Sequence, residues 1–354
     1  MTSDTMRNGG DLIAAGLLSP STQDDIDAVA ARYAVAVTAD IAALIDRDDP
    51  DDPVARQYLP RADELRDTPE EMADPIGDHA HSPVRGIVHR YPDRVLLMPL
   101  SACAVYCRFC FRRETVGPGN AALTPDDLET ALNYIRSNTN IWEVILTGGD
   151  PLLLSPRRLK DLIGALGAID HVAVIRIHSR VPMAAPRRVT AKLIEALATD
   201  KALWLAVHAN HANEFGAPQR AAIAKLARAG IPLVGQTVLL KGVNDDTAAL
   251  EALFRTMVAN RIKPYYLHHP DLARGTGQFR LDIDDGIALT QRLRGRISGL
   301  CQPSYVLDIP GGHGKVPLTP SHAARAEEPG RWEIRDIAGR VHAYPPDRPI
   351  ETER

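Results

Sequence analysis

Three cysteines lie within eight positions of this 354-residue chain, in the stretch Cys103-Ala-Val-Tyr-Cys107-Arg-Phe-Cys110. Structural zinc sites typically use four ligands in two pairs, and this C-x3-C-x2-C spacing offers only three thiolates. Three thiolates leave one iron of a [4Fe–4S] cluster without a protein ligand, so a small molecule can coordinate that iron. The fourth cysteine, Cys301, stands alone. The spacing predicts an iron–sulfur site with one open iron, rather than a set of inert buried thiols.

Two glycine-containing stretches could bind further small molecules. Thr147-Gly148-Gly149-Asp150 follows an apolar run, and adjacent glycines allow a ligand to approach the backbone closely, although a simple tight turn is the alternative. Asp308-Ile-Pro-Gly-Gly-His-Gly-Lys315 brings three glycines to a single lysine. This is not a phosphate loop, because Val316 stands where Ser or Thr is needed. A lysine on a flexible loop suits a Schiff base with an aldehyde.

The elements that must position these residues begin at Arg94. Short runs rich in Val, Ile and Leu alternate with amphipathic stretches that start at Thr124, Ser155 and Thr190. Apolar strands that are each followed by a helix predict a parallel sheet covered by helices. Six such units fit between residues 94 and 300, fewer than the eight of a closed barrel, and a doubly wound sheet also fits the pattern.

The chain divides by composition into three segments. We expect a helical N-terminal extension over residues 1–90, the strand–helix core over 91–320, and a small hairpin with a loose tail over 321–354. Lys plus Arg total 41 and Asp plus Glu total 45, a formal charge of −4 that argues against binding nucleic acid by charge. No apolar run approaches the roughly 20 residues needed to span a membrane, and we expect no secretory signal. The sequence therefore predicts a cytoplasmic protein.

The cysteine spacing, with an aromatic residue before the second and third cysteine, resembles the radical S-adenosylmethionine (SAM) superfamily. The resemblance implies that Cys103, Cys107 and Cys110 hold a [4Fe–4S] cluster and that SAM chelates the open iron. It implies a partial (β/α)6 barrel similar to a TIM barrel. It also implies that Gly148, Gly149 and Asp150 contact the amino group of SAM. A flavodoxin or ferredoxin is the expected reductant.

A more specific resemblance rests on several motifs taken together. HRYPDRVLL, LTGGDPLL, GQTVLLKGVND, PYYLHHPDLARG and DIPGGHGKVPL are similar to the lysine 2,3-aminomutase family, over roughly residues 74 to 320. The family adds pyridoxal 5′-phosphate (PLP) to the cluster and SAM. The resemblance assigns Lys315 to the Schiff base with PLP, Arg90 and Arg94 to its phosphate, Gln236 to its phenolic oxygen, and His208 to the SAM end of the barrel.

The same motifs imply an amino acid substrate. Arg112 matches the residue that binds the substrate carboxylate, while Asp271 and Asp308 match the pair that holds the ε-ammonium of lysine. Two carboxylates in an apolar pocket would select an ammonium and repel the side chain of glutamate, whereas arginine is less firmly excluded. The resemblance thus implies an isomerase that converts L-α-lysine to β-lysine by 2,3-amino migration, with an aminomutase acting on arginine as the alternative.

This chain also departs from the family pattern. Classical members bind zinc through a cysteine in GVNDC and cysteines near the C-terminus, but here Asp246 takes the first position and no cysteine follows Cys301. We therefore expect no zinc. Because zinc supports subunit contacts in those members, the oligomeric state is open and includes a homodimer. A short, zinc-less branch makes β-lysine for attachment to elongation factor P, so the product could be free or serve that modification.

Overall fold

The sheet at the centre of the molecule is open, because its two edge strands do not pair with each other. A computed structural model describes residues 5–117 and 122–345. Within these ranges, one sheet has nine strands in the order β11-β10-β9-β8-β7-β6-β5-β4-β3. They are β3 (Ile87–Tyr91), β4 (Arg94–Leu100), β5 (Glu143–Gly148), β6 (Val174–Ser179), β7 (Ala202–His208), β8 (Leu233–Val238), β9 (Ile262–His268), β10 (Ser304–Asp308) and β11 (Lys315–Pro317). Strands β4 to β10 run parallel, whereas β3 and β11 are antiparallel to their neighbours.

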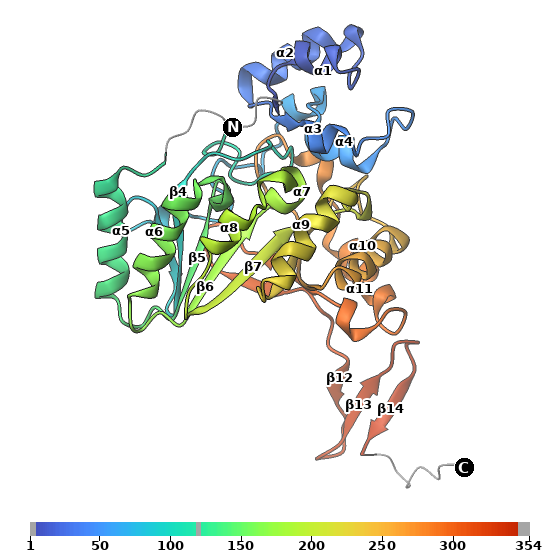
Figure 1. Ribbon diagram of the computed structural model, residues 1–354. Helices are drawn as coiled ribbons and strands as arrows, with labels where there is room; N and C mark the ends of the chain where they lie inside the picture. Colours follow the sequence, from blue (N-terminus) through green and yellow to red (C-terminus); the bar gives the residue numbers. More distant parts are fainter. Residues whose placement is uncertain (1–4, 118–121, 346–354) are drawn as a thin grey trace.

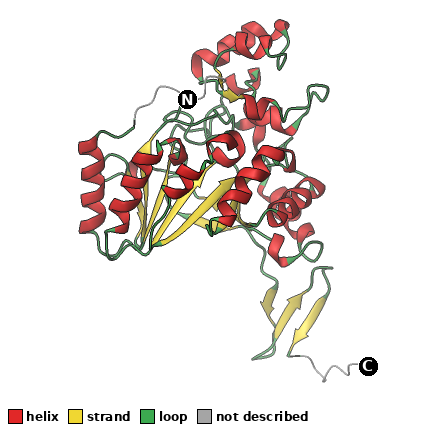
Figure 2. Cartoon of the chain, in the orientation of Figure 1, coloured by secondary structure: helices red, strands yellow, loops and turns green. Residues whose placement is uncertain are grey.

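Each parallel strand from β4 to β9 is followed by helical structure that packs along one face of the sheet (Figure 1, Figure 2). The helices are α5 (Pro125–Ser137), α6 (Pro156–Gly167), α7 (Val181–Ala184), α8 (Ala191–Glu195), α9 (Ala217–Arg228), α10 (Thr247–Ala259) and α11 (Ile283–Leu293). The side chains of Thr124, Ser155 and Thr190 cap the helices that they were predicted to start. The six strand–helix units and the partial barrel are confirmed.

The two faces of the strands differ in burial. In β6, Ile175 and Ile177 are completely buried in the core that the helices cover, while Arg176 and His178 alternate with them and are partly exposed. Alternate residues of a strand point to opposite faces, so the apolar residues pack under the helices and the polar ones line the concave face. Each fully buried Leu or Ile contributes about 1.5 to 3 kcal/mol.

The N-terminal extension is helical, as expected, and packs on the core. It contains β1 (Thr5–Met6), α1 (Gly9–Ala14), α2 (Gln23–Arg32), β2 (Val37–Thr38), α3 (Ala39–Ala42) and α4 (Pro53–Tyr58), followed by the 3-10 turns η2 (Ala62–Leu65) and η3 (His79–His81). Its apolar cluster includes Leu12, Ile41 and Tyr58 together with Val105, which lies between the first two cysteines. The extension therefore covers the cysteine loop.

The C-terminal segment projects from the barrel as a separate small sheet (Figure 1). It has three antiparallel strands, β12 (Ala323–Arg325), β13 (Trp332–Arg335) and β14 (Val341–Tyr344), of which the last two form the predicted hairpin. The division into three segments stays a prediction, and β3 spans the expected boundary at residue 90. Among the described residues, no helix combines the length and apolar character required to cross a membrane.

We expect Gly149→Ala to destabilise the protein. A Cβ at this position would lie 2.2 Å from the carbonyl oxygen of Ala102, so the end of β5 or the cysteine loop would have to move. Overpacking of this kind costs roughly 1 to 3 kcal/mol. The measurement is the free energy of unfolding in denaturant.

Gly164→Ala is the matched control, because a Cβ there meets nothing within 4 Å on an exposed face of α6. It should stabilise the protein by about 0.5 to 1 kcal/mol. A Gly149→Ala protein as stable as the wild type would contradict the close packing of β5 on the cysteine loop.

Candidate active site at the carboxyl ends of the strands

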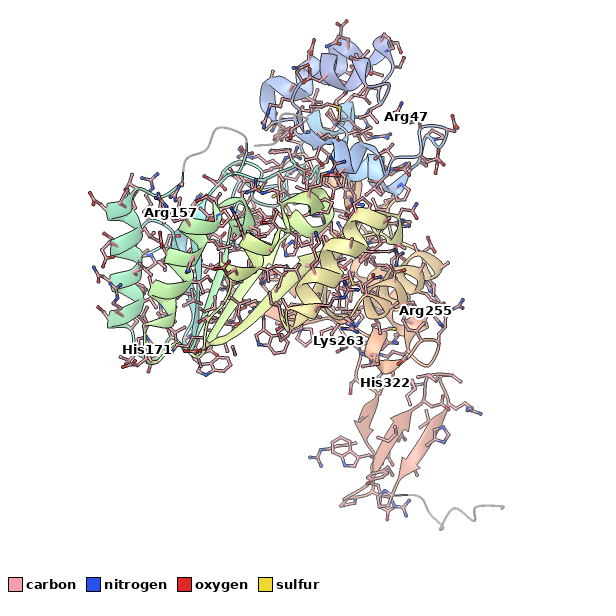
Figure 3. All side chains as sticks on the ribbon, in the orientation of Figure 1. Arg47, Arg157, His171, Arg255, Lys263 and His322 are labelled. Atoms are coloured by element: carbon pink, nitrogen blue, oxygen red, sulfur yellow. The ribbon has the colours of Figure 1, made fainter. Side chains whose placement is uncertain are left out.

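The cysteine loop leaves the carboxyl end of β4, next to the end of β5. The N–H of Gly149 donates to the carbonyl of Leu100 and that of Asp150 donates to Ala102, each at 2.8 Å. In Figure 3, His171 and Lys263 lie at the opposite ends of the strands, away from Arg47 of the extension. Because the carboxyl ends of parallel strands share one edge, residues from several strands converge at this end of the barrel.

The three thiols are neighbours and are half-buried. Burial raises the pKa of Cys103 well above its usual range, and negative charge on Asp150, Cys110 and Cys107 raises it further. Burial also raises the pKa of Cys107 to about 12 and raises that of Cys110. All three cysteines are free. In residues 5–117 and 122–345, no three His, Cys, Asp or Glu side chains already form a metal-binding group, so the thiols lie near one another without converging.

The side chain of Asp150 is committed to the protein itself. Its carboxylate accepts hydrogen bonds from Ser179 Oγ at 2.8 Å and from the backbone N–H groups of Arg180, Val181 and Leu152 at 2.7, 3.0 and 3.1 Å. Asp150 thus ties the end of β5 to the end of β6. Gly148 has a φ of +104°, which only glycine adopts readily, and it lies against Leu100 and Met98. The expected contacts of Gly148, Gly149 and Asp150 with SAM stay predictions.

Lys315, at the start of β11, is surrounded by polar and aromatic side chains. Its Nζ donates to the Asp308 carboxylate and lies 3.3 Å from Nδ1 of His268. The centre of the Tyr266 ring is 5.5 Å from Nζ. The backbone N–H of Lys315 donates to the hydroxyl of Tyr91 at 2.8 Å. The lysine therefore sits at a fixed place between β3, β9 and β10.

Asp271 and Asp308 have opposite electrostatic environments. Burial alone would raise the pKa of Asp308, but a hydrogen bond with His268 and the charge of Lys315 hold that pKa well below its usual range. Burial, together with the charge on Asp308, raises the pKa of Asp271 to about 7. One carboxylate is therefore already paired with an ammonium, and the other is close to half protonated at neutral pH.

Asp78 joins two of the predicted arginines. Arg90 Nη2 donates to one carboxylate oxygen of Asp78 at 3.2 Å, and Arg112 Nε donates to the other at 2.8 Å. Arg94 instead pairs with Asp93 at 2.7 Å and stacks over the Tyr91 ring at 3.7 Å. Arg90 and Arg112 therefore share one anion, while Arg94 is paired separately with Asp93.

Gln236 and His208 lie side by side on the concave face. They are register partners on β8 and β7. The ring centre of His178 is 5.4 Å from that of His208. Burial lowers the pKa of His208 to about 3, so its imidazole is neutral. Its Nε2 and the Nε2 of His268 are both buried without a hydrogen-bond partner, so the concave face offers polar atoms to a bound molecule.

Arg112 links the cysteine loop with the surroundings of Lys315. Its positive charge partly offsets the burial that raises the pKa of the Cys103 thiol and that of the Asp271 carboxyl. The two groups of predicted site residues therefore border one shared region. Cys301 is excluded from it, because the turn that holds Cys301 precedes β10, at the amino end of that strand.

Comparison with known proteins agrees with this geometry. The radical SAM superfamily matches residues 97–253, and the family described as lysine-2,3-aminomutase matches residues 290–353. The chain is 38% identical to the L-lysine 2,3-aminomutase of Clostridium subterminale, over 92% of this chain and 79% of the relative. It is 38% identical to a putative L-lysine 2,3-aminomutase of Aquifex aeolicus, over 92% and 88%. It is 33% identical to the glutamate 2,3-aminomutase of Clostridioides difficile, over 86% and 72%.

The chain belongs to the lysine 2,3-aminomutase family of radical SAM enzymes. The family uses a [4Fe–4S] cluster, SAM and PLP, and its radical chemistry requires a reductant. It is a family of isomerases.

The residues of this aminomutase-family chain fit those cofactors. Three free, half-buried thiols on one loop match a cluster with an open iron. The unpaired Nε of Arg90 and the unpaired Nε2 of His208 and His268 are buried donors or acceptors that a bound molecule can satisfy. An amine suits an aldehyde and a guanidinium suits a phosphate, so the residue types fit PLP, while the assignments of Lys315, Arg90 and Arg94 to it stay predictions.

Sequence reasoning missed two side chains of this site, Tyr91 and Asp78, and left His268 open as either lining of the site or core. Tyr91 could have been found, because it stands between the two arginines of HRYPDR, on the same short hairpin. His268 lies in the HHPD motif, but nothing in the sequence shows that it faces Lys315. Asp78 gave no local signal, because its role comes from Arg90 and Arg112, which lie 12 and 34 residues away.

We expect Asp271→Asn to stabilise the ligand-free protein more at pH 8 than at pH 5. The carboxyl ionises near pH 4 in the unfolded chain but near pH 7 in the folded protein, so stability is lost as the pH rises through this interval. Removing the charge should recover on the order of 2 kcal/mol between the two pH values. Thermal unfolding of the wild type and the variant at both pH values measures this difference in stability.

The control variant is Asp161→Asn, which removes a carboxylate from the exposed face of α6 and leaves the site intact. Equal stabilisation of Asp271→Asn at pH 5 and pH 8 would contradict the raised pKa of Asp271.

Proposed function

We propose that this chain is an aminomutase that moves the α-amino group of L-lysine to its β-carbon. One observation supports it most directly: the ammonium of a lysine side chain, Lys315, is already bound by Asp308 beside Asp271. A substrate lysine carries the same primary ammonium. The side chains around Lys315 therefore have the negative charge and the hydrogen-bond acceptors to hold the end of that substrate.

The charges of Asp308 and Asp271 argue against an acidic substrate. Asp308 is held in its ionised form, and Asp271 adds a second carboxyl within the same region. A glutamate side chain would place a third carboxylate there, without a free cation to compensate it. A lysine side chain instead supplies the missing charge, and Arg112 would bind the substrate carboxylate at the other end.

When bound, the cluster and SAM supply a carbon-centred radical that removes hydrogen, and PLP supplies an aldehyde that carries the migrating nitrogen. The chain positions and shields these groups. Arg90 and Arg94 would hold the phosphate, and Lys315 would hold the aldehyde carbon. To do so, Lys315 must leave Asp308 and lose a proton from Nζ. His268 is neutral, because burial lowers its pKa, and its Nδ1 lies 3.3 Å from that Nζ.

Departure of Lys315 from Asp308 has a second consequence. The carboxylate becomes free for the substrate ammonium, so loading of the cofactor and binding of the substrate are coupled through one anion. The covered face of the sheet and the extension over the cysteine loop limit access of water to the reacting atoms.

Several finer assignments belong to the same proposal. An arginine substrate is the alternative, because a guanidinium is also a cation. The proposal also includes a flavodoxin or ferredoxin as the reductant, a cytoplasmic location, a homodimer, and delivery of the product to elongation factor P.

We expect anaerobically reconstituted protein to convert L-lysine to β-lysine, as detected by mass spectrometry of the derivatised product. Lys315→Ala should lower the rate at least 100-fold and should prevent borohydride from trapping PLP on the chain. Lys160→Ala, an exposed position on α6, should retain both the rate and the trapping. Trapping at a site other than Lys315 would refute its assignment.

We expect Asp308→Asn to lower kcat/KM for lysine roughly 10- to 100-fold, the usual cost of losing a hydrogen-bonded charge pair. Competition between lysine, arginine and glutamate, each supplied to the wild type and the variant, measures the preference. Asp161→Asn should leave the profile unchanged. A wild type that prefers glutamate or arginine would refute the lysine assignment.

A further inference from the structure

A completely buried carboxylate of the N-terminal extension binds two buried arginines of the cysteine loop. Glu64, on η2, has no exposed surface, and the side chains of Arg108 and Arg113 are 1% and 0% exposed. Arg108 Nε donates to Oε1 of Glu64 at 2.8 Å and to Oε2 at 3.0 Å. Nη2 of Arg108 and Nη2 of Arg113 both donate to Oε2. One anion therefore holds two cations.

The two arginines stand on either side of the third cysteine. Arg108 lies between Cys107 and Cys110, and the backbone N–H of Arg113 donates to the Cys110 carbonyl at 3.2 Å. The backbone of Cys110 donates in turn to Cys107 at 3.1 Å. A shift of either guanidinium is therefore transmitted through a few bonds to the two thiols.

Other contacts fix the free ends of these arginines. Arg108 Nη1 donates to the Ala34 carbonyl at 2.7 Å, and Arg113 Nη1 donates to the Gly275 carbonyl at 2.6 Å. The guanidinium of Arg113 stacks on Tyr33 at 3.6 Å from the ring centre. Glu64 thus joins the extension, the cysteine loop and the loop after β9 in one network.

The charges of this network do not cancel. Glu64 contributes one negative charge and the arginines contribute two positive charges, so a net positive charge is buried beside the thiols. Buried charges act over several ångströms, because solvent screens them little. The potential of an iron–sulfur cluster depends on nearby charge and on burial, and positive charge favours the reduced state.

We propose that Glu64 is a positioning residue of the iron–sulfur site, whose carboxylate orients Arg108 and Arg113 around Cys110 and whose charge sets the potential of the cluster bound there. This inference depends on the cluster of the radical SAM family and is independent of the amino acid substrate. A wrong substrate assignment would therefore leave it standing.

The experiment is a charge series on the reconstituted holoenzyme. Glu64→Gln keeps the size and an acceptor but raises the net charge of the network by one. Arg113→Gln lowers that net charge by one, and the double variant restores the wild-type value. Asp63→Asn, the neighbouring and partly exposed residue that pairs with Arg61 and Arg66, is the matched control. Iron content, the spectrum of the reduced cluster by electron paramagnetic resonance, and its midpoint potential are measured for each.

We expect the midpoint potential to rise in Glu64→Gln, to fall in Arg113→Gln, and to return toward the wild-type value in the double variant. We expect the resonance spectrum of the reduced cluster to change in both single variants and to remain unchanged in Asp63→Asn. A purely structural ion pair would lower the thermal unfolding midpoint without this ordered series of potentials.

Wild-type potential and spectrum in Glu64→Gln, with full iron content, would overturn the proposal. Where Glu64→Gln gives too little folded protein, Arg113→Gln carries the test, because Arg108 stays paired with Glu64. An unchanged potential in that variant would overturn the proposal equally.

Discussion

Buried charges at the carboxyl end of this barrel are held mainly by opposite charges, and that constraint organises the site. Removing an ion from water costs several kcal/mol, so a buried ion needs an opposite charge or hydrogen bonds, and a carboxyl without them, such as Asp271, has a raised pKa instead. Four buried anions in particular each hold one or two cations. Glu64 holds Arg108 and Arg113, Asp78 holds Arg90 and Arg112, Glu214 holds Arg180, and Asp308 holds Lys315.

These pairs explain why the extension and the barrel form one functional unit. Two of the four anions, Glu64 and Asp78, precede the sheet, while their arginines lie in or next to the cysteine loop and β3. In an open barrel the first and last parallel strands have a free edge, and here the antiparallel strands β3 and β11 pair with those edges. The N-terminal extension packs over the cysteine loop at the carboxyl ends of the strands. The ion pairs hold it there, and the apolar cluster around Tyr58 and Val105 adds hydrophobic contact.

Asp246, where this chain departs from the family pattern, has a local structural role. At the position where classical members carry a zinc-binding cysteine, Asp246 caps helix α10, with its carboxylate accepting from the N–H groups of Ala248 and Ala249. An N-cap of this kind contributes about 1 kcal/mol to the helix. The carboxylate therefore has a local structural use that needs no metal.

The sequence by itself determined the fold class and the chemical groups. Alternating apolar strands and capped helices have short-range signals, so the strand β4 and the helix starts at Thr124, Ser155 and Thr190 could be predicted residue by residue. The cysteine spacing and the glycines before Lys315 are equally local. Only the tertiary structure decided which charges meet: Asp78 with Arg112, His268 with Lys315, and Glu64 with Arg113 are separated by 34 to 49 residues. The energy of such a pair depends on burial and on distance in space, and neither quantity is encoded in the spacing of residues along the chain.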